Sequence, residues 1–301
     1  MQLLHFPIEL VLLTLENLDV SSLATFLASS PSLAKTISSV SPRLITTQPT
    51  LLHAAAARNY TTLLQHLLTL LPATTLDSRQ HTALYRAAEA GALDAVRLLR
   101  FKPEPARRFA TETPLSVAAR NGRTAVVSLL LPSNLGAAPW ALVAAAAAGN
   151  ADIAQLLVPH CYELTPALCA ASAAGHVDII ELLLSAGGSA DAADIDGSTP
   201  LHYACRSGKA GVAQKLLAMQ AVRCKVDAQD CHGWTALHWA QFCGEKEVKD
   251  MLIAAGADVN VTNDDGRPAG GWGDEDAPDD DFSAWERMFV DVPTPRLAVV
   301  V

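Results

Sequence analysis

The sequence predicts an all-α protein built as a solenoid of helix–turn–helix units, and three observations carry that prediction. The 301-residue chain is 50% hydrophobic but only 5% aromatic, so its apolar content comes mostly from Ala and Leu, which favour closely packed helices. A frame of Leu, Ala and Gly recurs along the chain with a period of about 33 residues. Thr, Pro and Gly stand where each helix would begin or end.

Residues 1–40 do not follow the repeat frame and are expected to form a small helical segment. Helical spacing of apolar residues, Pro7 at a helix start and Asp19 as a second cap predict two or three short helices. Phe-Pro-x-Glu-Leu at residues 6–10, followed by Leu-Asp-Val-x-x-Leu at residues 18–23, resembles an F-box. The match departs from the typical motif because Phe6 replaces Leu and Leu18 directly precedes Asp19.

The resemblance implies that this F-box-like segment docks a Skp-family adaptor through apolar contacts. The side chains implied in that docking are Phe6, Pro7, Leu10, Leu13 and Leu23. The alternative is a plain cap, because the end of a solenoid must be covered in any case. Helices exposed away from the repeats would favour docking, and burial against residues 52–68 would favour the cap. Residues 41–48, with Pro42 and several Ser and Thr, are expected to be a connector.

From residue 49 to residue 262 the frame appears about seven times. A typical copy has Leu, then two small residues three and four positions later, then Gly at position seven, as in the alanine-rich run 142–149. In the last copy Gln241 takes the second of the two small positions. The anchoring leucines are Leu52, Leu84, Leu115, Leu142, Leu168, Leu201 and Leu237. In the first copy Asn59 takes the place of Gly, which supports the frame because Asn is the second choice for a left-handed backbone.

Each copy predicts two helices joined by a left-handed turn. Thr lies two residues before the anchoring Leu in five copies, where it would cap the first helix, and Gly175 and Gly208 are expected at positive φ between the helices. A second helical pattern ending in paired leucines follows each Gly, as in residues 177–184. The alanines predict packing, because only small side chains let neighbouring first helices approach closely.

Two segments carry a specific family resemblance. DIDGSTPLHYACRSG at residues 194–208 and DCHGWTALHWAQFCG at residues 230–244, with GADVN at 256–260, closely resemble ankyrin repeats. The resemblance covers roughly residues 49–262 and is looser in the earlier copies. It implies helix pairs connected by short β-hairpin loops. Around residues 131–140 and 158–166, where the anchoring leucines are only 27 and 26 residues apart, plain loops are expected instead. It also implies that His53, His202 and His238 bind backbone between units and do not bind a metal ion.

The resemblance implies that hairpin tips and first-helix faces bind a protein partner. In the two best copies, the expected partner-binding residues are Ile195, Asp196, Ser198, Tyr203, Arg206, His232, Trp234, Trp239 and Phe242. Tyr, Trp and Arg dominate interface energetics, which favours this assignment. Trp234 and Trp239 could equally serve repeat packing.

Residues 263–301 begin as an eighth copy and then leave the frame. Six of the chain's negative charges lie between Asp274 and Asp281, and an acidic stretch of this kind is expected to be solvated and partly flexible.

The sequence lacks the motifs of several other protein classes. No Gly-rich phosphate loop, His-Glu-x-x-His or Cys-x-x-Cys appears, so we expect no enzyme, cofactor or metal site. A net charge of −9 argues against nucleic acid. The apolar runs are shorter than a membrane span, and Pro7 and Glu9 interrupt any signal peptide. Irregularly spaced cysteines are expected to be reduced, in a cytoplasmic or nuclear protein.

The sequence therefore supports two hypotheses of function, which belong to different classes. The first is a substrate receptor of a cullin-type ubiquitin ligase, in which the F-box-like helices bind the adaptor and the repeats bind the target. The second is a binding scaffold without a ligase role.

Overall fold

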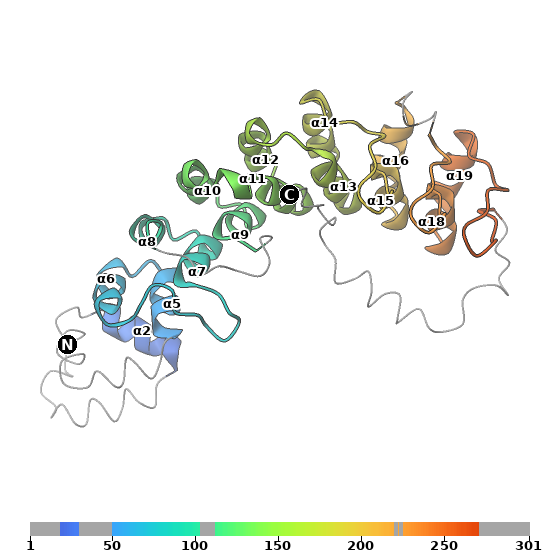
Figure 1. Cartoon of the computed structure of the whole chain (residues 1–301). Coiled ribbons are helices and arrows are strands. Elements are labelled where there is room, and N and C mark those ends of the chain that lie inside the picture. The colour runs from blue at the N-terminus through green and yellow to red at the C-terminus, as the bar shows by residue number, and fades with distance from the viewer. Residues whose placement is uncertain (1–18, 30–49, 103–111, 220–221, 223–224, 271–301) are drawn as a thin grey trace, which may run out of the picture. The chain divides into compact units, whose positions relative to one another are not determined.

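The computed structural model describes residues 19–29, 50–102, 112–219, 222 and 225–270 (Figure 1). Its contacts divide the chain into a first unit up to Ala137 and a second unit from Ala138. In the described part of the chain every regular element is a helix, and only isolated bridges pair Leu76 with Thr82 and Thr262 with Pro268. The prediction of an all-α fold is therefore confirmed. The number of repeats, and their union in one array, stay predictions.

The first unit places paired helices side by side. The α-helices described in it are α2 (Val20–Ser29), α5 (Thr50–Ala57), α6 (Thr61–Leu70), α7 (Ala83–Ala90), α8 (Leu93–Leu99), α9 (Pro114–Arg120) and α10 (Thr124–Leu130). The first helices of the pairs, α5, α7 and α9, contact one another in that order, and the second helices α6, α8 and α10 do the same. Each pair thus stacks on the next within this unit.

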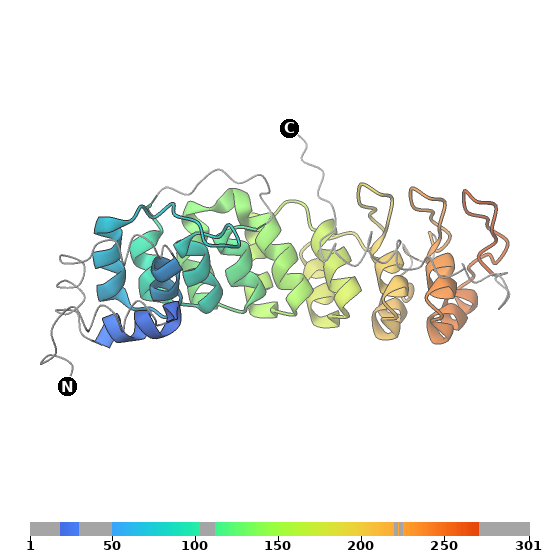
Figure 2. The same cartoon turned by 90° about the horizontal axis from the view of Figure 1, so that it is seen from below.

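The second unit repeats this arrangement. Among its described residues the α-helices are α11 (Ala138–Ala148), α12 (Ala151–Leu157), α13 (Thr165–Ala174), α14 (Val177–Ser185), α15 (Pro200–Arg206), α16 (Ala210–Leu217), α18 (Ala236–Phe242) and α19 (Lys246–Ala254). The first helices α11, α13, α15 and α18 form one row, and the second helices α12, α14, α16 and α19 form the other. The loops before α15 and α18 and after α19 project side by side at one edge (Figure 2).

The alanine-rich helix α11 shows why its side chains are small. Ala141, Ala145 and Ala146 are fully buried, and α11 packs closely on α13. A branched side chain at these positions would hold the two helix axes apart. The interpretation of the alanines as packing residues is therefore confirmed.

The turn between paired helices is left-handed, as the frame predicts. Asn59, the one substitute for glycine in the frame, has φ 59°, and Gly175 and Gly208 have φ 95° and 63°. The other frame glycines with positive φ are Gly91, Gly122, Gly149 and Gly244. Residues without a Cβ, or with a short polar side chain, adopt this conformation at the lowest cost.

Replacing a turn glycine should therefore destabilise the fold. We expect Gly208→Val to lower the free energy of unfolding by about 1 kcal/mol or more, because a β-branched residue is strained at positive φ. A Cβ there would also collide with the Glu245 carboxylate. Chemical denaturation measures the loss. Gly211→Val is the matched control, since Gly211 lies in α16 with open space around it. Equal stability of the two variants would contradict the prediction.

Two segments, around residues 131–140 and 158–166, form 3₁₀ turns where plain loops were expected from the short spacing of the anchoring leucines. η2 (Leu131–Ser133), η3 (Leu135–Ala137) and η4 (Val158–His160) occupy these segments. Pro132 and Pro159 lie in the first turn of η2 and η4, where the fixed φ of proline suits a helical start. The expectation of irregular loops is corrected on this point.

Helix α2 packs on the first helix pair. Leu23, Ala24 and Leu27 are fully buried, and α2 contacts both α5 and α6. Leu23 therefore offers no exposed docking surface in the folded chain. The other adaptor-docking residues proposed from the sequence, Phe6, Pro7, Leu10 and Leu13, lie outside the described residues.

Candidate functional site

The loops before α15 and α18 are each built on an aspartate, half-buried at Asp194 and buried at Asp230. The Asp194 Oδ1 atom accepts hydrogen bonds from the backbone N–H groups of Asp196 and Ser198, at 3.0 and 2.9 Å. The Asp230 Oδ1 atom accepts from those of His232 and Trp234, at 2.9 and 3.0 Å. These bonds close each loop into a tight turn and fix the direction of its tip.

The second oxygen of each aspartate holds a side chain nine residues later, on the following helix. The Tyr203 hydroxyl donates to Asp194 Oδ2 at 2.7 Å, and the Trp239 indole N–H donates to Asp230 Oδ2 at 2.9 Å. In the first unit Arg86 donates to Asp77 Oδ2 in the same way, at 2.8 Å. Burial and the bond to Asp194 raise the pKa of Tyr203, so its hydroxyl keeps its proton. Loop and helix are thereby locked together.

Adjacent loops are joined through their backbones. The Cys231 N–H donates to the Asp196 carbonyl at 2.8 Å, and the Asp264 N–H donates to the His232 carbonyl at 3.2 Å. The three loop tips at this edge therefore form one continuous surface within the second unit (Figure 2).

An aromatic cluster lies beneath these tips. The ring of Trp234 lies 4.6 Å from that of Trp239 and 5.2 Å from that of Phe242, centroid to centroid, and the second contact is edge-on. The Arg206 guanidinium lies 5.0 Å from the Tyr203 ring and 5.5 Å from the Trp239 ring. Cation–π contacts of this kind hold a guanidinium in a defined orientation.

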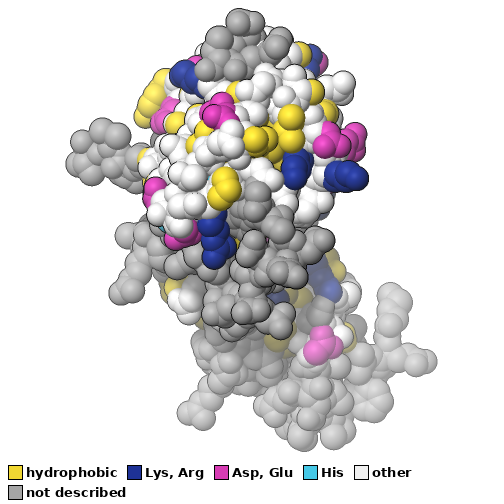
Figure 3. Space-filling view, turned by 90° about the vertical axis from the view of Figure 1, so that its right-hand side faces the viewer, with side chains coloured by type: hydrophobic (Ala, Val, Ile, Leu, Met, Phe, Trp, Pro, Cys, Tyr) yellow, Lys and Arg dark blue, Asp and Glu magenta, His cyan; other side chains and the backbone are white. Residues whose placement is uncertain are grey.

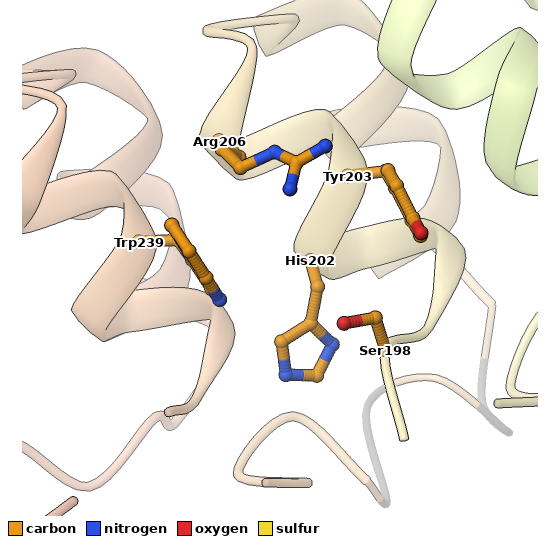
Figure 4. A pocket seen from close by; sticks show the side chains of 5 residues that line it. All are labelled: Ser198, His202, Tyr203, Arg206 and Trp239. Carbon is orange, nitrogen blue, oxygen red and sulfur yellow. The ribbon is translucent and has the colours of Figure 1, made fainter. Parts of the chain in front are cut away.

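A small pocket opens between α15 and α18 beside this cluster (Figure 4). Its walls are Ser198, His202, Tyr203, Arg206 and Trp239. Figure 4 shows the Arg206 guanidinium above the imidazole, between Tyr203 and the indole of Trp239. The pocket is too small for a metabolite-sized ligand.

The three histidines of the frame bind backbone, as the resemblance implied. His202 Nδ1 accepts from the Thr199 N–H at 3.1 Å, so Nε2 carries the proton and points at the Ala228 and Trp234 carbonyls, 3.1 and 3.2 Å away. His238 Nε2 lies 3.0 Å from the Arg267 carbonyl, and His53 Nε2 lies 2.9 Å from the His81 carbonyl. Each imidazole thus links its own helix pair to the loop that follows that pair in the chain.

Mild acid should therefore destabilise the second unit. Burial lowers the pKa of His202 and of His238, although the nearby Asp230 carboxylate opposes the shift. The unfolded chain then binds these protons more readily, starting at about pH 6.5, so the free energy of unfolding falls as the pH drops below that value. Above about pH 6.5 the contribution of these two neutral histidines to the free energy of unfolding is fully present. Melting temperatures between pH 8 and pH 5 test the sign, and a rise on acidification would contradict it.

The structure brings the proposed partner-binding residues together, with different exposures. Ile195 is 52% exposed at a loop tip and His232 is also exposed, whereas Asp196, Ser198, Tyr203, Arg206, Trp234 and Phe242 are half-buried. Trp239 is only 9% exposed and hydrogen-bonded, which favours packing over direct partner contact. Sequence reasoning missed Asp194 and Asp230 as organisers of this face. The signal was their identical position, seven residues before Leu201 and Leu237.

Other site types find no support within the described ranges. No group of three or more His, Cys, Asp or Glu residues there could hold a metal ion. The described cysteines are free thiols, and burial raises the pKa of Cys169 and Cys205. None of the helices described has the length and hydrophobicity that a membrane crossing requires.

The family model described as "Ankyrin repeats (3 copies)" matches residues 52–141, 115–192 and 167–263. Together these matches extend from residue 52 to residue 263 of the 301 residues. No curated protein shows significant similarity to the chain.

Proposed function

Because the chain belongs to the ankyrin-repeat family, whose repeats are protein-interaction modules, we propose that its partner binds the loop tips and the α15–α18 face. The observation that carries this proposal is the half-buried group of Tyr203, Arg206, Trp234 and Phe242, which lies around the packed ring of Trp239. Such residues dominate binding energy when they lie at the centre of an interface. Here their geometry is set in advance by Asp194 and Asp230, which lowers the entropic cost of binding.

Exposed residues at the loop tips provide the test. We expect Ile195→Asp with His232→Asp to weaken partner capture by about tenfold or more, because a desolvated charge would replace apolar contact. Affinity capture on the full chain with quantitative mass spectrometry measures this. Leu135→Asp is the matched control, since Leu135 is 51% exposed and belongs to the first unit, whereas the loop tips belong to the second. Equal capture by both variants would rule out this face as the binding surface.

The N-terminal segment decides what kind of binding protein this is. A substrate receptor of a cullin-type ubiquitin ligase would use its F-box-like helices to bind a Skp-family adaptor. A scaffold would use them to cover the first helix pair. The complete burial of Leu23, Ala24 and Leu27, on a helix that packs on α5 and α6, favours the scaffold, so we propose a binding scaffold with the receptor as the alternative.

Two measurements separate these functions. If the chain is a scaffold, we expect the intact chain to bind no purified Skp-family adaptor. We also expect deletion of residues 1–40 to lower the melting temperature, because the face of α5 and α6 beneath α2 would be exposed. For the receptor, the intact chain would bind the adaptor, Pro7→Ala with Leu10→Ala would weaken that binding, and the deletion would leave the melting temperature unchanged.

A further inference from the structure

We propose that the turn at the end of α8, formed by Arg100, Phe101 and Lys102, is a docking site for an acidic segment of a partner protein. The turn belongs to the first unit, whereas the binding face proposed above belongs to the second. It is therefore a second binding function, independent of the first. The support comes from the geometry of the turn, its exposed ring, its unpaired guanidinium and the positions of the carboxylates around it.

The backbone holds this turn in one conformation. The Arg100 N–H donates to the Val96 carbonyl at 2.9 Å, where α8 ends, and the Lys102 N–H donates to the Leu99 carbonyl at 2.8 Å. Leu99 is only 1% exposed, so the turn is anchored in the core of the first unit. A fixed backbone lowers the entropic cost of binding through the side chains that it presents.

The ring of Phe101 is exposed and carries the guanidinium of Arg100. Phe101 is 76% exposed, although burial of its side chain would be favourable. The Arg100 guanidinium carbon lies 4.3 Å from the ring centroid, and this cation–π contact orients the guanidinium. A lone exposed apolar side chain is common on protein surfaces. An exposed ring with an oriented cation on it offers a partner both apolar contact and charge, the combination that dominates interface energetics.

Arg100 lacks a hydrogen-bond acceptor for its side chain. Within the part of the chain that the structure describes, its guanidinium makes no hydrogen bond or ion pair, and its Nε atom is buried without a partner. Arg100 as a whole is half-buried, so water compensates this charge only in part. A carboxylate that pairs with the two terminal Nη atoms would provide the missing compensation, in the forked geometry that guanidinium favours.

The described carboxylates of the first unit all interact with other groups. Their neighbours are Ser22 for Asp19, Arg86 for both Asp77 and Glu89, Arg97 for Asp94, and His81 for Glu112. Lys102 is exposed and likewise has no ion pair among the described residues. The two cations of the turn are therefore not neutralised by any described carboxylate, and carboxylates of a partner would complement them.

The chemistry of the turn fits an acidic protein segment better than a nucleic acid. A nucleic acid binds along a basic stripe that neutralises many phosphates, whereas this turn offers two cations in a chain of net charge −9. Two carboxylates on either side of an apolar residue match the two cations and the ring between them. By contrast, the outer face of the last helix pair carries charges of both signs around the hydrophobic side chains at its centre (Figure 3), so it favours no one charge in a partner.

Two labelled peptides test the chemistry of the occupant. The first has Glu-Leu-Glu at its centre between Gly and Ser residues, and the matched peptide has Gln-Leu-Gln there. Fluorescence anisotropy with the full chain at physiological salt should show the acidic peptide binding about fivefold more tightly, because two exposed ion pairs separate the peptides. Equal binding of both peptides would overturn the proposal. Tighter binding of a labelled single-stranded oligonucleotide would also overturn it.

Variants of the turn test the position of the site. Arg100→Gln should weaken binding of the acidic peptide by about tenfold, because it removes a charge-assisted pair. Phe101→Ser should weaken it by about fivefold although both cations remain, because the apolar contact is lost. Arg120→Gln is the matched control, since Arg120 is exposed and is the last residue of α9, whereas the turn precedes the start of that helix. Its effect should be less than about twofold.

The control also decides between docking and a purely structural arginine. A cation at the C-terminus of a helix is stabilised by the helix dipole, which could by itself account for Arg100. A loss in Arg100→Gln no larger than that in Arg120→Gln would favour this explanation and refute the docking site. Melting curves show whether the variants fold, and the comparison of the two peptides on the natural chain decides the result if one does not.

Discussion

Asp230→Ala is expected to lower the free energy of unfolding by about 3–5 kcal/mol, because it leaves several buried donors without an acceptor. The backbone N–H groups of His232 and Trp234 and the indole N–H of Trp239 all donate to this carboxylate. Asp230 is 8% exposed, so water replaces it poorly. Chemical denaturation followed by tryptophan fluorescence measures the loss.

Asp196→Ala is the matched control for this prediction. Asp196 lies in the preceding loop, is more exposed, and contributes its backbone carbonyl to Cys231, which alanine retains. Its substitution should change the free energy of unfolding by less than about 0.5 kcal/mol. If the two aspartate variants proved equally stable, the loop carboxylate would not organise this face.

Ala145→Leu is expected to lower the free energy of unfolding by about 3 kcal/mol, because the larger side chain overpacks the contact between α11 and α13. Ala145 is fully buried, and these two helices are in close contact. Helix propensity does not oppose the change, since leucine is nearly as good a helix former as alanine. The melting temperature and the denaturation midpoint should both fall.

Ala148→Leu isolates packing from helix propensity. Ala148 lies on the same helix and is exposed, so the added carbons meet solvent and the stability should change little. A large loss at both positions would mean that the cost lies in the helix itself and not in the approach of its neighbour.

Much of the described fold could be predicted from local patterns. The frame of Leu, small residues and Gly gave the helix pairs and their left-handed turns, including the turn at Asn59. It did so because capping and positive φ are properties of a few adjacent residues. The backbone role of His202 and His238 followed from the family resemblance, and their contacts with the loop of the next unit confirm it.

The short spacings were harder to interpret. Around Leu131 and Val158 the pattern showed only that a hairpin was missing, and it did not distinguish an irregular loop from the 3₁₀ turns found there. A single turn involves too few residues for its periodicity to be read. Prolines at 132 and 159 were the signal that could have decided it.

The sequence by itself determined the all-α class, the helix boundaries marked by Thr and Gly, and the small-residue packing of α11. Only the tertiary structure decided that Asp194 and Asp230 fix Tyr203 and Trp239, that Trp239 is nearly buried, and that Leu23 packs on α5 and α6. The physical reason is the range of the interactions. Turns and caps depend on neighbouring residues, whereas burial and side-chain hydrogen bonds depend on how separate elements pack, which no local period encodes.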